Sequence, residues 1–246
     1  MQLEVYQTDA EVYEAVAASA AQILVAAAAT GRATVALPGG RGGRAIMLAL
    51  AGRGDIPWQR LVVFFTDEYC LPDGDARRTA QVARGSVLGP RGVPPACVHA
   101  IVGDDASAAV AAYAEVLARE LGTPPVLDLI LLDLGAGGEV SALMPGSEAA
   151  RGASAGATVA AAEVAAEPRV ARVTLTAVAL RAARRVIVSA TGGERAAAVM
   201  AALREPVDAV RRPAQSVLPS ATTSWFVDRA AVEPLLRDAR PAAGAQ

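Results

Sequence analysis

The sequence predicts an α/β protein in which helices cover a mostly parallel sheet. Helical and extended patterns alternate along the 246 residues, and this alternation is typical of parallel strands joined by helical crossovers. The segments 61–66 and 127–134 are short, continuous apolar runs, as buried strands of such sheets are. Because no repeat and no linker divides the chain, we expect one domain over 1–240 and a disordered tail at 241–246.

The first element expected is a helix over 11–29, with Thr8 or Asp9 as its cap and Gly31 as its stop. Strands are expected at 33–37, 61–66, 127–134, 172–176, 185–190 and in the TTSWFVD segment at 222–228. Helical patterns cover about 44–52, 77–88 and 105–121, a short segment after 176, a segment from Glu194, and 229–237. The Ala/Gly-rich stretch 149–166 is expected to be a flexible excursion.

Composition excludes several kinds of site. Hydrophobic residues make up 53% of the chain and the formal net charge is −2, so the sequence lacks the basic footprint that nucleic acid or an anionic membrane requires. All 23 basic residues are arginine, and without lysine a Schiff base or a Walker A loop is excluded. Cys70, Cys97 and His99 are too few and too scattered to bind zinc. We expect no metal and no cofactor.

The sequence also predicts a cytoplasmic location. The amino terminus is acidic and lacks the basic-then-apolar order of a signal peptide. We expect no membrane span, because the Ala-rich run before Gly31 contains Glu14 and Gln22 and no apolar stretch approaches about 20 residues. Two cysteines in such a chain are expected to be reduced.

The first candidate site is the loop after the strand at 33–37, because ligands of open α/β sheets bind at the carboxyl ends of strands. It contains Gly39, Gly40, Arg41 and Arg44 and leads into a helix. Close-approaching glycine backbone, the amino end of a helix and arginine charge together suit a phosphate group. A plain glycine-rich turn with solvated arginines is the alternative, and the residues alone leave both open.

Two further loops present carboxylates. Asp67 directly follows a buried strand, where partial loss of solvent suits a general acid or base, although it could also cap the loop. Glu139 follows the glycine-rich turn at 135–138 and is either presented to a ligand or solvated.

Eight segments, several of which contain these loops, match a known protein family in their order along the chain. They are LPGG at 37–40, IPWQRLVVFFTDEYCLP at 56–72, ARGSVL at 83–88, VLDLILLDLGAGG at 126–138, LMPGS at 143–147, RVTLTAVAL at 172–180, GGERAAAV at 192–199 and SWFVDRAAV at 224–232. Over almost its full length the chain thereby resembles the 6-phosphogluconolactonase branch of the glucosamine/galactosamine-6-phosphate isomerase superfamily. The resemblance implies a three-layer, Rossmann-like fold with helices on both faces of the sheet, and a sugar 6-phosphate ligand.

The resemblance also implies roles for individual residues. Gly39 and Gly40 would line the phosphate loop, with Arg41 and Arg44 beside them. Arg172 and Arg195 would hold the phosphate. Asp67 would face the reacting end of the sugar.

This chain departs from the family pattern at several of these positions. Glu139 stands where the family has a catalytic histidine, and Gly137 stands where it has an aspartate. Tyr69 replaces the arginine of the lactonases and matches the deaminases instead. His99, the single histidine, lies in a strand-like segment where a structural role is expected.

The leading interpretation is hydrolysis of 6-phospho-D-glucono-1,5-lactone to 6-phosphogluconate, a step of the pentose phosphate pathway. Glu139 would activate water, while the N–H groups of Gly137 and Gly138 would stabilise the oxyanion. One alternative is an amino-sugar-phosphate deaminase or isomerase, which Tyr69 favours. A second is a non-catalytic sugar-phosphate-binding pseudoenzyme, which the lost aspartate and histidine favour. A small sugar phosphate is the expected partner, and either a monomer or a dimer is compatible with the sequence.

Overall fold

The computed structural model describes residues 2–151, 156–162, 170–217 and 222–238. Its main sheet has six strands in the order β1-β9-β8-β5-β2-β3, and every neighbouring pair is parallel. The strands are β1 (Gln2–Tyr6), β2 (Ala33–Leu37), β3 (Leu61–Phe65), β5 (Leu129–Asp133), β8 (Val186–Ala190) and β9 (Thr223–Asp228). The predicted parallel α/β fold is therefore confirmed.

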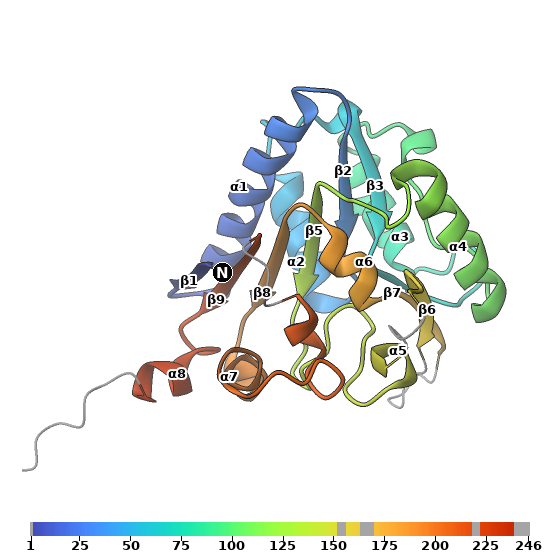
Figure 1. Cartoon of the computed structure of the whole chain (residues 1–246). Helices are drawn as coiled ribbons and strands as arrows, with labels where there is room; N and C mark the ends of the chain where they lie inside the picture. Colours follow the sequence, from blue (N-terminus) through green and yellow to red (C-terminus); the bar gives the residue numbers. More distant parts are fainter. Residues whose placement is uncertain (1, 152–155, 163–169, 218–221, 239–246) are drawn as a thin grey trace, which may run out of the picture.

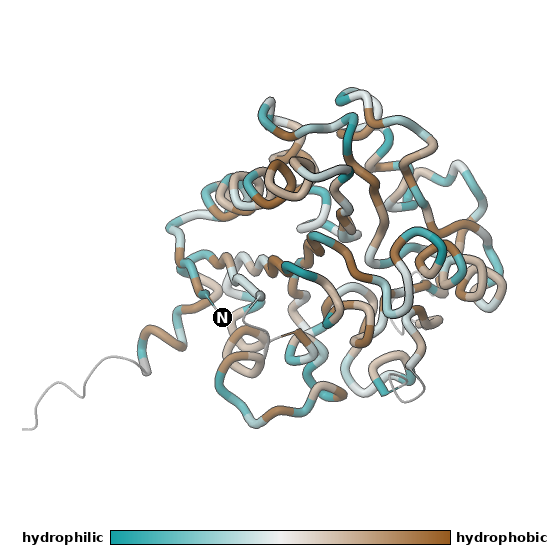
Figure 2. Tube along the Cα trace, turned by 45° about the horizontal axis from the view of Figure 1, so that its top comes forward, coloured by the Kyte–Doolittle hydropathy of each residue, from teal (hydrophilic) through white to brown (hydrophobic). Residues whose placement is uncertain are grey.

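Helices lie on both faces of this sheet, and Figure 1 shows α6 (Ala177–Ala182) in front of it and α2 (Gly40–Ala51) behind it. The other helices are α1 (Asp9–Ala28), α3 (Thr79–Ala83), α4 (Ala106–Leu121), α5 (Glu148–Arg151), α7 (Ala196–Arg204) and α8 (Glu233–Asp238). The central strands β3, β5 and β8 are mostly apolar and buried, and Figure 2 shows hydrophobic and hydrophilic residues alternating along the outer helices.

Helix α1 begins as the sequence predicts, with Thr8 as its cap: the Thr8 side chain accepts a hydrogen bond from the N–H of Glu11. The helix has 20 residues, and a window of 18 of them has a mean hydropathy of 1.3, so within the described residues it meets the length and composition of a membrane span. The expectation that no apolar stretch approaches this length was therefore wrong. A core helix has the same features, and Val16, Ala20 and Leu24 of α1 are buried in the core.

A second, antiparallel sheet of three strands was not predicted. It has the order β4-β7-β6 and comprises β4 (Asp67–Tyr69), β7 (Arg172–Leu175) and β6 (Val159–Ala162). The expected strand 61–66 thus ends at Phe65, and Asp67 opens a new strand instead of a loop. This happens because the N–H of Leu175 bonds the carbonyl of Thr66 and redirects the chain. Part of the expected excursion at 149–166 forms α5 and β6, and its remainder lies outside the described residues.

Smaller differences concern single elements. The expected helix at 77–88 is α3 followed by a π-helical turn at Arg84–Leu88. The last helix starts at Glu233 and not at 229, because Asp228 accepts a hydrogen bond from the N–H of Ala231 and closes a turn there. Strand β1 was not predicted at all, and the tail at 241–246 lies outside the described residues. The single domain over 1–240 stays a prediction.

Candidate active site

Two adjacent cavities open where β2 and β5 end, and they share Gly39, Gly40 and Arg41. One, of about 260 Å³, is lined by both predicted catalytic carboxylates; we call it the catalytic cavity. The other, of about 370 Å³, has Arg44, Tyr69 and Thr79 in its lining as well; we call it the side cavity. The cavities therefore lie at the strand ends where the sequence predicts a site.

The glycine-rich loop passes close to other parts of the site. A Cβ on Gly39 would lie 2.7 Å from Thr79 Oγ1 and 3.0 Å from Asp67 Oδ2, so only glycine fits there. Gly40 has φ +77°, a conformation that glycine adopts without strain. Helix α2 starts at Gly40, and its first N–H groups have no acceptor within the helix. Arg41 and Arg44 are exposed and form no ion pair within the described residues.

Asp67 and Arg172 form an ion pair in the catalytic cavity. They come from the antiparallel strands β4 and β7, and their side chains are only 2% and 11% exposed. Thr66 donates a further hydrogen bond to Asp67 at 3.0 Å. The Arg172 guanidinium also lies 4.6 Å from the ring centre of Tyr69. Burial alone would lower the pKa of Arg172, but the charge of Asp67 raises it above its usual range, so Arg172 stays charged.

Glu139 projects from the loop after β5 and lies against glycine backbone. A Cβ on Gly135 would collide with its carboxylate, so this glycine makes room for the folded-back side chain. Glu139 lines the catalytic cavity. Its carboxylate forms no hydrogen bond and no ion pair within the part of the chain that the structure describes. Gly138 lines neither cavity, and its N–H already donates to the carbonyl of Gly135 at 3.0 Å.

Arg195 also reaches the catalytic cavity, from the 3₁₀ turn Gly193–Arg195 that precedes α7. Its Nε donates to the carbonyl of Leu134 at 2.7 Å, and its Nη1 donates to the carbonyl of Thr191 at 2.6 Å. Nη1 further pairs with Glu194, and Nη2 faces Asp133 at 3.3 Å. Arg195 is therefore held in place on several sides.

Asp133 and Ser141 also line the catalytic cavity, and neither was predicted from the sequence. Asp133 is the last residue of β5, and a carboxylate ending the apolar run LDLILLD is a signal that could have found it. Ser141 has φ 58°, which is uncommon for a residue other than glycine. Its Oγ donates to the carbonyl of Thr66 at 2.7 Å and lies 2.8 Å from Thr174 Oγ1. These contacts fix the backbone just before Asp67, and no local sequence signal marks them.

Glu68 and His99 are titratable residues that line neither cavity. Glu68 accepts hydrogen bonds from the N–H groups of Thr79 and Ala80 and thereby starts α3; burial raises its pKa. His99 stacks on Phe64 with a ring separation of 4.9 Å, and its structural role stays a prediction. In the described ranges, no three His, Cys, Asp or Glu side chains are grouped so that they could hold a metal ion.

A parallel sheet whose carboxyl edge carries a cavity lined by arginines and carboxylates is the arrangement of an α/β enzyme for a small anionic ligand. The chain belongs to the glucosamine-6-phosphate isomerase/6-phosphogluconolactonase family, whose model matches residues 7–225. It is 35% identical to the 6-phosphogluconolactonase of Streptomyces coelicolor over 238 residues, which cover 91% of this chain and 90% of that protein. It is 33% identical to the 6-phosphogluconolactonase of Mycobacterium tuberculosis, covering 85% of this chain and 88% of that one.

Solved structures share the fold. The 6-phosphogluconolactonase of Trypanosoma brucei superposes with a TM-score of 0.83 at 24% identity, covering 95% of this chain and 98% of that chain. A monomeric glucosamine-6-phosphate deaminase superposes with a TM-score of 0.80 at 17% identity, covering 95% and 99%. Because both branches of the family share one architecture, the fold alone does not distinguish lactonase from deaminase.

Proposed function

We propose that this protein hydrolyses 6-phospho-D-glucono-1,5-lactone to 6-phosphogluconate. The observation that carries the proposal is the position of Glu139, which lines the catalytic cavity together with Asp67 and Arg172. Because no side chain in the described residues pairs with the Glu139 carboxylate, it is free to accept a proton from water. The sequence relatives support the same chemistry, since those named above are 6-phosphogluconolactonases.

In this proposal Glu139 takes a proton from water while the water oxygen attacks C1 of the lactone. The negative charge that develops on the carbonyl oxygen is stabilised by the N–H group of Gly137, in the turn just before Glu139. The bond between C1 and the ring oxygen then breaks, and the ring oxygen takes the proton from Glu139. The product is a carboxylic acid that ionises at neutral pH. Each turnover therefore consumes one water and releases one proton to solvent.

The phosphate is held by Gly39, Gly40 and the arginines at the same edge of the sheet. Arg41 has no competing ion pair within the described residues, and the start of α2 directs N–H groups toward an anion. Arg172 lines the catalytic cavity and stays charged there, so it attracts an anionic group of the ligand. Arg195 contributes through its Nη2, which faces the cavity beside Asp133. A cytoplasmic location belongs to the same proposal.

The test is a lactonase assay on the purified full chain with a panel of substrates. Proton release from the phosphorylated lactone should exceed spontaneous hydrolysis clearly, whereas unphosphorylated gluconolactone should react much more slowly. Glucosamine 6-phosphate should give no ammonia. A rate equal to that in buffer would contradict the proposal, and if 6-phosphogluconate then still raised the melting temperature, the pseudoenzyme alternative would hold. Release of ammonia would favour the deaminase alternative. Sedimentation of the same sample distinguishes a monomer from a dimer.

A further inference from the structure

Asp133 is fixed in the catalytic cavity on three sides. Its side chain is 10% exposed. Ser189 on β8 donates a hydrogen bond to Oδ1 at 2.8 Å, and Arg195 Nη2 lies 3.3 Å from Oδ2. On the third side the carboxylate fills the space that Gly42 of α2 leaves by having no side chain. Asp133 therefore cannot turn away when a ligand enters.

The only nitrogen of Arg195 that remains open to a ligand is Nη2, and it already faces Asp133. A guanidinium has five N–H groups. The Nε group is used by Leu134, and the two Nη1 groups are used by Thr191 and Glu194. An anion that reaches Arg195 must therefore bind Nη2, where it meets Asp133 Oδ2. Two anionic groups would then share one end of one guanidinium.

The charges around Asp133 place the protonation state of its carboxylate under the influence of a bound anion. Burial raises the pKa of Asp133 and the charge of Glu139 adds to the rise, while Ser189 and Arg195 act in the opposite direction. The other titratable groups that face this region are Tyr13 from α1, Glu194 from the turn before α7, and Asp67, Arg41 and Arg172 around the cavity. A phosphate dianion at Nη2 adds negative charge directly beside the carboxylate and so favours its protonation.

We propose that Asp133 is a further substrate-binding residue, which takes up one proton from solvent as the phosphate binds Arg195 and then donates a hydrogen bond from Oδ2 to a phosphate oxygen. The proposal rests on the proposed function, because it needs the phosphate at Arg195. The proton returns to solvent when the product leaves, so no net proton is added to the reaction. Protonation turns a group that would repel the phosphate into a donor for it.

The test is calorimetric titration of the full chain with 6-phosphogluconate at pH 7.5 and 8.5, in two buffers that differ in ionisation enthalpy. The second phosphate pKa is about 6, so the ligand itself stays a dianion at both pH values. We expect uptake of about one proton per ligand and, from that linkage, an affinity that falls about tenfold per pH unit. Asp133→Asn should bind without proton uptake and with an affinity that does not depend on pH.

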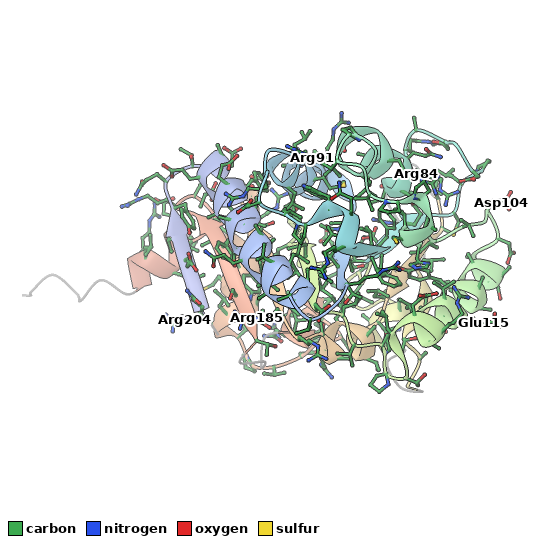
Figure 3. The ribbon with its side chains drawn as sticks, turned by 90° about the horizontal axis from the view of Figure 1, so that it is seen from above. Arg84, Arg91, Asp104, Glu115, Arg185 and Arg204 are labelled. Atoms are coloured by element: carbon green, nitrogen blue, oxygen red, sulfur yellow. The ribbon has the colours of Figure 1, made fainter. Side chains whose placement is uncertain are left out.

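Two further variants sharpen this test. Asp104→Asn makes the same chemical change at an exposed residue on the outer edge of the molecule (Figure 3) and should behave as the wild type. Ser189→Ala removes a hydrogen bond that favours the ionised Asp133 carboxylate. The affinity of this variant for 6-phosphogluconate should therefore begin to fall at a higher pH than that of the wild type. The inference is overturned if the wild type binds without proton uptake, or if Asp133→Asn keeps the uptake or binds more weakly at every pH. Absence of any binding of 6-phosphogluconate would contradict the proposed function instead.

Discussion

Gly42 and Asp133 occupy one space: the Asp133 carboxylate lies where a side chain on Gly42 would be. One residue is in the first turn of α2 and the other ends β5, so this contact joins the phosphate loop to the centre of the sheet. The absence of a side chain at Gly42 is thus a condition for the observed position of Asp133, and through it of Arg195.

Gly42→Ala is expected to lower stability in spite of its place in a helix. Alanine favours a helix over glycine by about 0.8–1.0 kcal/mol, but overpacking a buried site costs about 1–3 kcal/mol. Asp133 cannot give way freely, because Ser189 and Arg195 hold it. The melting temperature should therefore fall. Gly85→Ala is the matched control, since a Cβ there meets nothing within 4 Å, and it should cause no loss. Equal melting temperatures for the two variants would show that the Asp133 carboxylate moves aside for a side chain at position 42 without loss of stability.

Arg172→Ala is expected to weaken binding of 6-phosphogluconate by about ten- to a hundredfold, because a charge-assisted hydrogen bond contributes about 1.5–3 kcal/mol. Arg172→Lys should lie between this variant and the wild type, since lysine keeps the charge but loses the planar fork. Arg119→Ala changes an exposed arginine on α4 and is the control. Titration calorimetry measures all three affinities. A loss of less than about threefold in Arg172→Ala would argue against phosphate binding at Arg172.

The parallel sheet could be predicted because its buried strands are continuous apolar runs, as in 61–65 and 129–133. The second sheet could not, because DEY in β4 and VAAA in β6 carry no strand pattern and depend on pairing with β7. Glu139 could be identified because it directly follows a glycine turn. Ser141 could not, since its role depends on its φ of 58° and on Thr66, which is 75 positions away.

His99 is expected to affect the pH dependence of stability and not catalysis. Burial lowers its pKa, although Glu120 at 3.9 Å acts in the opposite direction. The folded state then binds fewer protons than the unfolded state, so the contribution of His99 is present above pH 6.5 and is lost as the pH falls through its lowered pKa. The melting temperature of His99→Phe, which keeps a ring on Phe64, should decline less between pH 7 and pH 5 than that of the wild type.

The same variant tests the site assignment. His99 lines neither cavity, so His99→Phe should retain lactonase activity to within about twofold at pH 7.5. Loss of activity in a folded variant would mean that the single imidazole takes part in the reaction.

Lactonase activity is expected to survive prolonged dialysis against EDTA. The mechanism uses Glu139 as the base and the backbone N–H of Gly137 as the donor to the oxyanion, so it assigns no step to a metal ion. The measurement compares rates before dialysis, after dialysis, and after addition of Mg²⁺ or Zn²⁺. An activity that disappears and returns only with a divalent ion would require a different base.

The central claim is that Glu139 is the general base, and the direct measurement is the lactonase rate of Glu139→Gln beside its affinity for 6-phosphogluconate. General-base catalysis contributes about 10²–10⁴-fold, so the lactonase rate of this variant should fall by that factor toward the spontaneous rate. Its affinity should change by less than about threefold, because glutamine keeps the shape of the side chain. Glu115→Gln, on the outer edge of α4 (Figure 3), should match the wild type in both respects. Equal lactonase rates for Glu139→Gln and the wild type would contradict the account and would make Asp67 the base to test.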